Sequence, residues 1–179
     1  MIKKFASYYK PHRKLFFIDM IFAFLISIFD LIFPLVTRNF VNDIIPNGRM
    51  DLLYKWTFYL FLLFILRYIS QYIVNYWGHI VGVRIEHDMR RDIFAHLQTL
   101  SFTYFDNNKT GHIMSTIVND LRDITELAHH GPEDIFISSV MLIGSFIILV
   151  RIDWRLTIII FSFIPLMISS ATGAIVSAI

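Results

Sequence analysis

Three long apolar stretches constrain the fold of this chain more than any other feature of its sequence. They cover residues 15–36, 56–83 and 135–150. About 20 apolar residues in a helix cross the roughly 30 Å of hydrocarbon in a bilayer, and the first two stretches are long enough to do so. The third reaches that length only if it begins near Pro132 and includes Glu133 and Asp134. A fourth apolar run begins at Trp154 and continues to the last residue.

The composition agrees with membrane insertion. The chain is 56% hydrophobic and contains 18 Phe, and its mean hydropathy is +0.59. These values are too high for an ordinary soluble domain, so we predict an all-α membrane protein with four spans in this chain. The net charge of +2 and the absence of a basic patch with interleaved aromatics argue against nucleic-acid binding. The absence of Cys excludes disulfides and thiolate metal sites.

The distribution of Lys and Arg predicts the orientation. Five basic residues precede the first span with no acidic residue among them: Lys3, Lys4, Lys10, Arg13 and Lys14. Such clusters stay on the cytoplasmic side, so we expect a multi-pass protein of the cell membrane with a cytoplasmic N-terminus. The predicted order is a cytoplasmic interfacial elbow (1–14), a span (15–36), an external loop (37–55), a span (56–83), a cytoplasmic hairpin (84–131), a span (132–150), an external turn (151–155) and an incomplete fourth span (156–179).

Each of the first two spans carries one polar stripe. On a helical wheel with 100° per residue, the stripe of the first span covers an arc of about 80°; it consists of Asp19, Ala23, Ser27, Asp30, Pro34 and Thr37. The stripe of the second span covers about 120° and consists of Arg67, Gln71, Asn75, Gly78, His79 and Gly82. Ionisable groups inside a bilayer face protein or a watery cavity. We therefore take Asp19, Asp30, Arg67, Gln71, Asn75 and His79 as candidates for lining a substrate pathway. An Asp30–Arg67 ion pair that holds two helices together is the alternative, and both interpretations can hold.

The hairpin at residues 84–131 is the most informative segment. No Gly or Pro interrupts the sequence from Val83 to Tyr104, so the second span should continue into the cytoplasm as one helix, on the order of 65 Å in all. The turn signals gather at residues 105–111, where we expect one helix to close and another to open, with room for a short helix across the tip. Gly131-Pro132 predicts a kink in the returning arm.

The residues at the tip resemble a known family. The run Leu100-Ser-Phe-Thr-Tyr-Phe-Asp-Asn-Asn-Lys-Thr-Gly-His-Ile-Met-Ser115, followed by Asn119-Asp120, is similar to the first intracellular loop of ABC exporter transmembrane domains. Two further stretches agree: Tyr9-Lys-Pro-His-Arg-Lys14, and Asp153-Trp-Arg-Leu-Thr157 with Pro165. The resemblance covers nearly the whole chain, as the N-terminal part of a half-transporter.

The resemblance implies a coupling element at the tip of the hairpin. In this family the tip docks into nucleotide-binding domains, which bind ATP and Mg²⁺. When the family's coupling element is mapped onto this sequence, the docking segment is residues 104–112, with Phe105 as the apolar residue that inserts into the partner. The segment consists of Tyr104, Phe105, Asp106, Asn107, Asn108, Lys109, Thr110, Gly111 and His112. The implied partners are nucleotide-binding domains, a second transporter half, the lipid bilayer and an unidentified exported substrate, in the plasma membrane of a bacterium. A homodimer and a heterodimer are equally open.

The chain also departs from the family pattern. It ends in or just after its fourth span and contains no Gly-x-x-x-x-Gly-Lys-Ser/Thr loop. We therefore expect no ATP hydrolysis and no cofactor from this chain itself. Its last residues, 169–179, are small and uncharged, where the family usually shows a basic helical exit.

Other interpretations of the motifs carry less weight. Glu126-x-x-His129, near Asp123 and His130, has the spacing of di-iron bundles, but the second such motif is missing, so we expect no metal site. Two functions from other classes stay open: a membrane signalling protein, and an accessory or scaffold protein that uses the hairpin to dock a partner.

Overall fold

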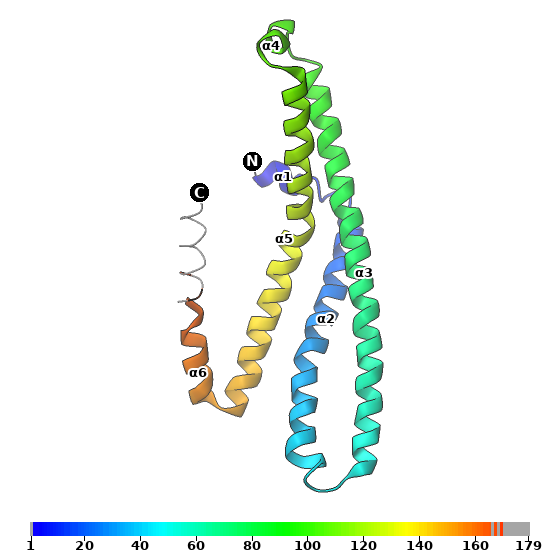
Figure 1. Ribbon diagram of the computed structural model, residues 1–179, viewed down its shortest axis with the longest axis vertical. Coiled ribbons are helices and arrows are strands. Elements are labelled where there is room, and N and C mark those ends of the chain that lie inside the picture. Colours follow the sequence, from blue (N-terminus) through cyan, green and yellow to red (C-terminus); the bar gives the residue numbers. More distant parts are fainter. Residues whose placement is uncertain (1, 166, 168, 170–179) are drawn as a thin grey trace. The chain divides into compact units, whose positions relative to one another are not determined.

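The structure is a computed structural model that describes residues 2–165, 167 and 169, without the side chains of Ile2 and Asn107. The described part is helical and contains no strand, which confirms the predicted all-α class. Its elements are α1 (Ile2–Ser7), α2 (Arg13–Asn39), the π-helix η1 (Phe40–Ile44), α3 (Met50–Leu97), α4 (Phe102–Asn107), α5 (Thr110–Ile152) and α6 (Trp154–Ser162) (Figure 1). Two compact units divide the chain at residues 138 and 139, and each is described by itself.

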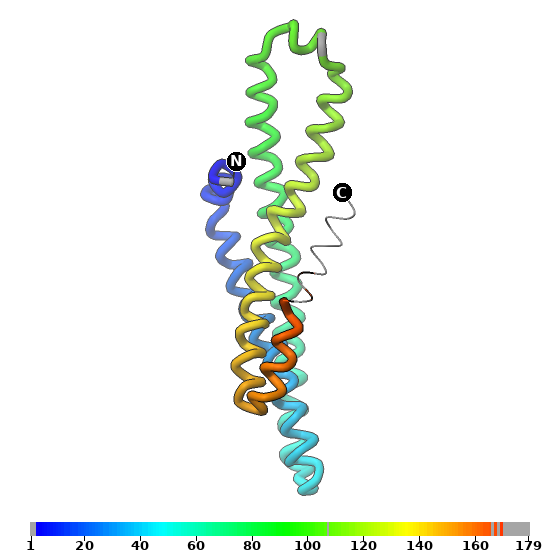
Figure 2. Tube along the Cα trace, turned by 90° about the vertical axis from the view of Figure 1, so that its left-hand side faces the viewer, coloured from blue at the N-terminus to red at the C-terminus, as the bar shows by residue number. Residues whose placement is uncertain are grey.

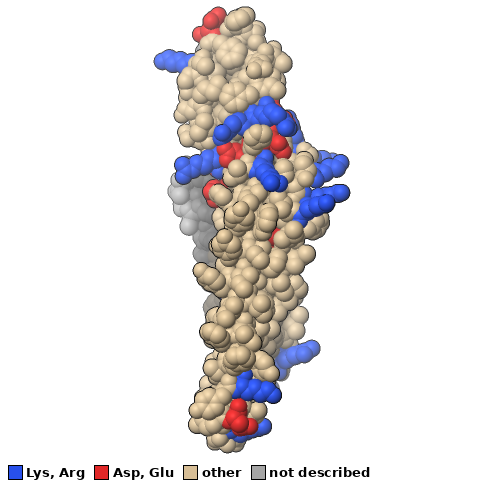
Figure 3. Space-filling view, turned by 90° about the vertical axis from the view of Figure 1, so that its right-hand side faces the viewer, with Lys and Arg blue, Asp and Glu red and all other residues tan. Residues whose placement is uncertain are grey.

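Among the described residues, three helices are long and apolar enough to cross a membrane. They are α2 together with η1 (Arg13–Ile44), α3 and α5, and each contains one of the three apolar stretches. On the face drawn in Figure 3, charged side chains gather above and below a long, almost uncharged stretch. The fourth span predicted at residues 156–179 coincides with α6 at its start, but most of its second half lies outside the described residues.

Helix α3 is one continuous helix of 48 residues, as the uninterrupted sequence after Val83 predicts. At 1.5 Å per residue it is about 72 Å long. It ends at Leu97, before Tyr104, and the short helix α4 follows after a turn. Figures 1 and 2 show α4 between the ends of α3 and α5. Helix α5 already begins at Thr110, so Gly111 lies inside its first turn rather than closing a loop.

The segment expected as an external loop, residues 37–55, is mostly helical. Helix α2 continues to Asn39, η1 follows to Ile44, and α3 begins at Met50. Only residues 45–49 lie outside the helices, and Gly48 among them adopts a φ of 61°, a left-handed conformation that costs glycine little. The connection between η1 and α3 is therefore much shorter than the external loop predicted at residues 37–55.

Helix α5 continues through Gly131 and Pro132, so the kink predicted there does not end the helix. Pro132 cannot donate a backbone hydrogen bond to the Ala128 carbonyl. The Tyr9 hydroxyl donates to that carbonyl instead, at 2.8 Å. Gly131 also lacks the Cβ that would clash with the proline ring. A side chain from the N-terminal segment thus satisfies the acceptor that proline leaves free.

The first unit, Met1–Ser138, contains two apolar clusters. Ala23 and Ile26 of α2 pack with Val74 of α3, and Phe136 of α5 covers them. The second cluster consists of Val81, Ile85 and Ala128, with Phe5, Tyr8, Tyr9, Leu15 and Met89 packed against it. The small side chains at the centre of both clusters let the helix backbones approach closely, as is common where membrane helices pack.

The second unit, Ser139–Ile179, contains the end of α5 and all of α6. Asp153 separates these two helices, and its side chain accepts hydrogen bonds from the backbone N–H groups of Arg155 and Leu156, at 2.9 and 3.2 Å. This N-cap satisfies donors that the first turn of α6 would otherwise leave unpaired. The Phe146 and Phe161 rings lie edge to face at 4.9 Å between centroids.

Candidate functional site

Asp30 and Arg67 join the polar stripes of α2 and α3. The Arg67 guanidinium donates from Nε to Asp30 Oδ1 at 2.5 Å and from Nη2 to Oδ2 at 3.0 Å. This two-point geometry is the strong form of an arginine–carboxylate contact. The side chains keep 36% and 35% of their surface exposed. The ion pair that the sequence left as an alternative is therefore formed, and it faces open space on one side.

The other candidates in the stripe of α3 lie apart from that pair. Gln71 donates to Asn75 at 3.0 Å within the same helix, and Asn75 and His79 are exposed. The face of α3 that is buried against other helices is formed by Ser70, Val74, Gly78, Val81, Gly82 and Ile85. The helix is thus rotated so that its small and β-branched residues, and not its amides, meet α2 and α5.

Asp19 contributes to a second polar group, which we call the three-helix junction: Asp19 of α2, Gly78 of α3, and His129 and Glu133 of α5. Asp19 and Glu133 are 3% and 7% exposed, so both carboxyl groups are buried among the helices. A Cβ on Gly78 would overlap the His129 imidazole, and one on Gly82 would press against Thr125 at 3.2 Å. Gly78 therefore makes room for the His129 ring, and Gly82 makes room for Thr125.

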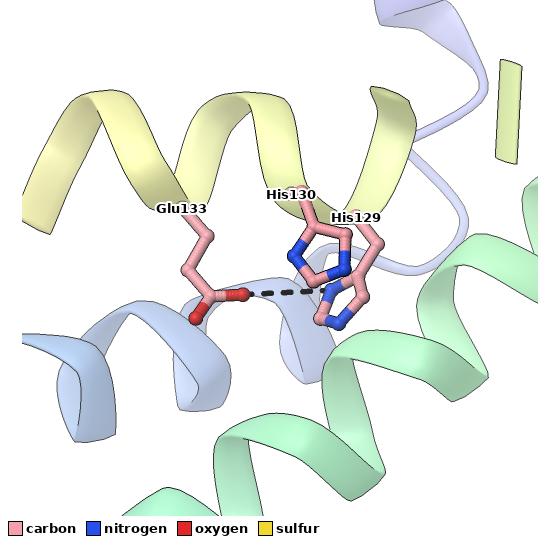
Figure 4. Close-up of side chains that lie close together, drawn as sticks. All are labelled: His129, His130 and Glu133. Atoms are coloured by element: carbon pink, nitrogen blue, oxygen red, sulfur yellow. Dashed lines mark ion pairs between the residues drawn. The ribbon is translucent and has the colours of Figure 1, made fainter. Parts of the chain in front are cut away.

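Three buried side-chain atoms in the described part of the chain lack a hydrogen-bond partner, and all belong to this junction. They are Asp19 Oδ1, His129 Nδ1 and Glu133 Oε2. The last two face each other at 3.6 Å (Figure 4), which is longer than a hydrogen bond. The neighbouring ring of His130 lies 4.4 Å from that of His129 between centroids. Buried polar groups are normally satisfied, so this cluster requires an explanation.

The motif noted in the sequence, Glu126-x-x-His129, is not brought together. Glu126 instead faces His130 at 3.6 Å on the exposed side of α5, and Asp123 is exposed as well. His129 faces Glu133, which sequence reasoning assigned only to the end of a span. The signal that could have found the pair is the i, i+4 spacing, which places two residues on one face of a helix.

The N-terminal elbow attaches to the hairpin through polar contacts. Tyr8 donates to Asp92 at 2.9 Å, and His12 lies 3.0 Å from Asp88. Asp88 lies beyond the predicted span, and the hydrogen bond from His12 holds the pKa of its carboxyl below the usual value. Burial raises the pKa of the Tyr9 hydroxyl, which stays a donor to Ala128. The elbow thus contacts both arms of the hairpin.

The predicted docking segment, residues 104–112, covers the second half of α4, the break at Asn108 and Lys109, and the first turn of α5. Asn108 closes α4 by donating to the Tyr104 carbonyl at 2.9 Å. Phe105 is half-buried and lines an apolar hollow with Leu97, Leu100 and Met114. The aromatic side chain that projects is Phe102, which is 89% exposed and which sequence reasoning did not select.

The polar members of the segment are accessible. Asp106, Lys109, Thr110, Gly111 and His112 are exposed, while the side chain of Asn107 lies outside the described residues. A Cβ on Gly111 would meet nothing within 4 Å. The tip therefore combines two exposed aromatic side chains, Phe102 and the less exposed Tyr104 (38%), with polar groups of both charges.

Comparison with known proteins matches residues 16–172 to the ABC transporter transmembrane region. An uncharacterised ABC transporter ATP-binding protein of Bacillus subtilis (strain 168) is 44% identical over 168 residues, which cover 94% of this chain and 29% of that protein. A putative multidrug export ATP-binding/permease protein of the same strain is 26% identical, with 93% and 30% covered. The ATP-dependent lipid A-core flippase of Thiobacillus denitrificans is 27% identical, with 91% and 28% covered. The chain thus spans less than a third of the length of these relatives.

Proposed function

Since the chain belongs to the ABC transporter transmembrane region family, we propose that it forms the membrane part of an ATP-driven exporter subunit in a bacterial cell membrane. Two relatives are named for export of multiple drugs and for flipping of a lipid, and we carry over from them only the outward direction of transport. The three candidate membrane helices and their exposed apolar surface support insertion in a bilayer. The basic N-terminal segment supports a cytoplasmic N-terminus.

The observation that carries this proposal is the short helix α4 at the far end of the α3–α5 hairpin. In our proposal, α4 and residues 108–112 dock into a nucleotide-binding domain, which holds ATP and Mg²⁺ outside residues 1–179. The exposed ring of Phe102 would insert into an apolar pocket of that domain. Asp106, Lys109 and His112 would form a polar rim around it. Half-buried Phe105 would fix α4 against the arms, because it lines one apolar hollow together with Leu97 of α3 and Met114 of α5.

The Asp30–Arg67 pair provides the proposed pathway with a charged feature near α2 and α3. One side of the pair is open, and Gln71 and Asn75, which pair with each other further along α3, offer further polar groups. A second transporter half, identical or different, would close the pathway. This assignment supports an exported substrate with a polar portion.

Transport and ATP hydrolysis by the complete subunit in proteoliposomes test the docking. Phe102→Ala removes the projecting ring without disturbing the helix, whereas Val118→Ala removes an exposed side chain of the α5 arm away from the tip and is the matched control. Coupling between two sites in a protein typically changes the affinity at one of them by roughly 5- to 150-fold. Taking the lower end as a guide, we expect Phe102→Ala to lower transport per ATP hydrolysed by at least about fivefold. Equal coupling in both variants would contradict the docking assignment.

A further inference from the structure

We propose that His129, His130 and Glu133 form a binding site for one divalent transition-metal ion of the zinc class, with the Asp19 carboxyl beside it. All members lie in the first compact unit, on α5 and α2. The site is separate from the docking surface at the tip of the hairpin, and it does not depend on the export function proposed above.

The spacing of the donor atoms fits a metal ion better than a hydrogen bond. One donor atom from each of His129, His130 and Glu133 lies within 4.8 Å of the others, and His129 Nδ1 is 3.6 Å from Glu133 Oε2. Zinc binds imidazole nitrogen and carboxylate oxygen at about 2.0–2.2 Å in a tetrahedral arrangement, so two of its ligands are about 3.4 Å apart. The observed 3.6 Å is close to that edge length.

Burial provides the driving force for the ion. The side chains of His129 and Glu133 are 8% and 9% exposed, and the two atoms that face each other are those without a hydrogen-bond partner. A buried carboxyl group carries its charge at a large energetic cost unless it is paired or coordinates a metal, and otherwise it takes up a proton. None of the ion pairs found among the described residues joins Asp19 or Glu133 to a Lys or Arg. A divalent cation would neutralise both carboxylates at once.

The backbone around the site holds the first ligand in place. Gly78 leaves the space that the His129 ring occupies, because a Cβ there would overlap the ring. The residue before His129, Ala128, is fixed through its carbonyl by the Tyr9 hydroxyl. His129 and Glu133 are four residues apart and project from one face of α5. His130 is 57% exposed, and its ion pair among the described residues is with exposed Glu126, a contact that contributes little and can be exchanged for a metal bond.

The ligand types select the ion. Two imidazoles and carboxylates suit zinc and its neighbours in the first transition series, whereas Ca²⁺ and Mg²⁺ prefer sites made of oxygen alone. A water molecule or a shared proton is the competing occupant of the space between His129 and Glu133, and the experiment separates these outcomes.

Cobalt is the probe, because Co²⁺ occupies zinc sites and its visible absorption reports the coordination. The purified complete protein in detergent is stripped with a chelator and titrated with Co²⁺, and Zn²⁺ is then added in competition. We expect one Co²⁺ per chain, a spectrum of four-coordinate cobalt with nitrogen and oxygen ligands, and full displacement by Zn²⁺. Absence of this spectrum from protein that retains its helical circular dichroism would overturn the proposal.

Two matched variants identify the ligands. Glu133→Gln removes the buried charge and preserves the side-chain volume, and Glu126→Gln makes the same change on the exposed side of α5. We expect Glu133→Gln to weaken Zn²⁺ binding by at least about tenfold and Glu126→Gln to leave it unchanged. Asp19→Asn provides a second buried variant, with a smaller loss of affinity. Equal Zn²⁺ affinity in all four proteins would refute the site. The site would also be refuted if the protein bound no metal and Glu133→Gln raised its thermal stability. That result would indicate that water or a shared proton occupies the space between His129 and Glu133.

Discussion

Replacing Tyr9 by Phe tests how α5 tolerates a proline in its interior. The change removes only the hydroxyl that donates to the Ala128 carbonyl at 2.8 Å. The ring contacts with Phe5 and Phe16, at 5.7 and 5.2 Å between centroids, remain. Ala128 is 1% exposed, so water cannot replace the lost donor. Leaving a buried acceptor without a partner costs about 1–3 kcal/mol, and we expect the free energy of unfolding to fall by that amount.

A Pro132→Ala background shows whether the proline is the cause. With Ala at position 132, the backbone N–H can donate to the Ala128 carbonyl within the helix, and the Tyr9 hydroxyl is no longer its only donor. The cost of Tyr9→Phe should then shrink to about 0.5–1 kcal/mol. The difference between the two backgrounds is a coupling energy of roughly 1–2 kcal/mol, which a double-mutant cycle measures directly.

The assay is reversible unfolding by SDS in mixed micelles, followed by tryptophan fluorescence. Tyr8→Phe is the control, because that hydroxyl donates to Asp92 in an exposed pair and its loss should cost less than about 1 kcal/mol. An equal cost of Tyr9→Phe in the Pro132 and Ala backgrounds would refute the reasoning. A cost no larger than that of Tyr8→Phe would refute it as well.

Two further predictions concern helix packing. Gly78→Ala should lower the free energy of unfolding by about 1–3 kcal/mol because its Cβ overlaps the His129 ring. The control is Gly111→Ala, whose Cβ meets nothing within 4 Å and which should be neutral or stabilise α5 by up to about 1 kcal/mol. Similar losses in both variants would contradict the close packing at Gly78. Asp30→Ala should cost about 1–3 kcal/mol through its two charge-assisted hydrogen bonds, and the charge-swapped Asp30→Arg/Arg67→Asp protein should unfold at higher SDS than either single swap. A double variant no better than the singles would contradict the ion pair as a stabilising contact.

Local patterns in the sequence predict the helices well. The length of α3 follows from an uninterrupted run of residues, and the short helix at the tip from the turn signals after it. A kink at Pro132 is predicted by the same kind of local rule and stays a prediction. Helix α5 continues through Pro132, and the Ala128 carbonyl that the proline leaves free accepts from Tyr9, more than a hundred residues earlier. Such compensation depends on tertiary contact, and no window around Pro132 contains it.

Among the polar sites too, some contacts can be predicted from local sequence patterns, and others depend on tertiary contacts. Asp30 and Arg67 lie on facing stripes, so their pairing could be anticipated. Whether His129 pairs with Glu126 or Glu133 depends on the rotation of α5 against α3, because both spacings bring side chains close on a helix. Gly78 admits the His129 ring and Gly82 lies close to Thr125, and neither contact can be read from the sequence of α3 alone. At the tip, the exposure of Phe102 and the burial of Phe105 depend likewise on how α4 lies across the two arms.

The length of α3 has a mechanical consequence. A rod of about 72 Å that tilts by about 5° around one end moves its other end by about 6 Å, slightly more than one turn of a helix. The tilt would hardly disturb contacts near the pivot, where displacements stay below about 1 Å over the first two turns. A tilt of α3 too small to break side-chain contacts at one end would therefore displace α4 by about the length of one helical turn.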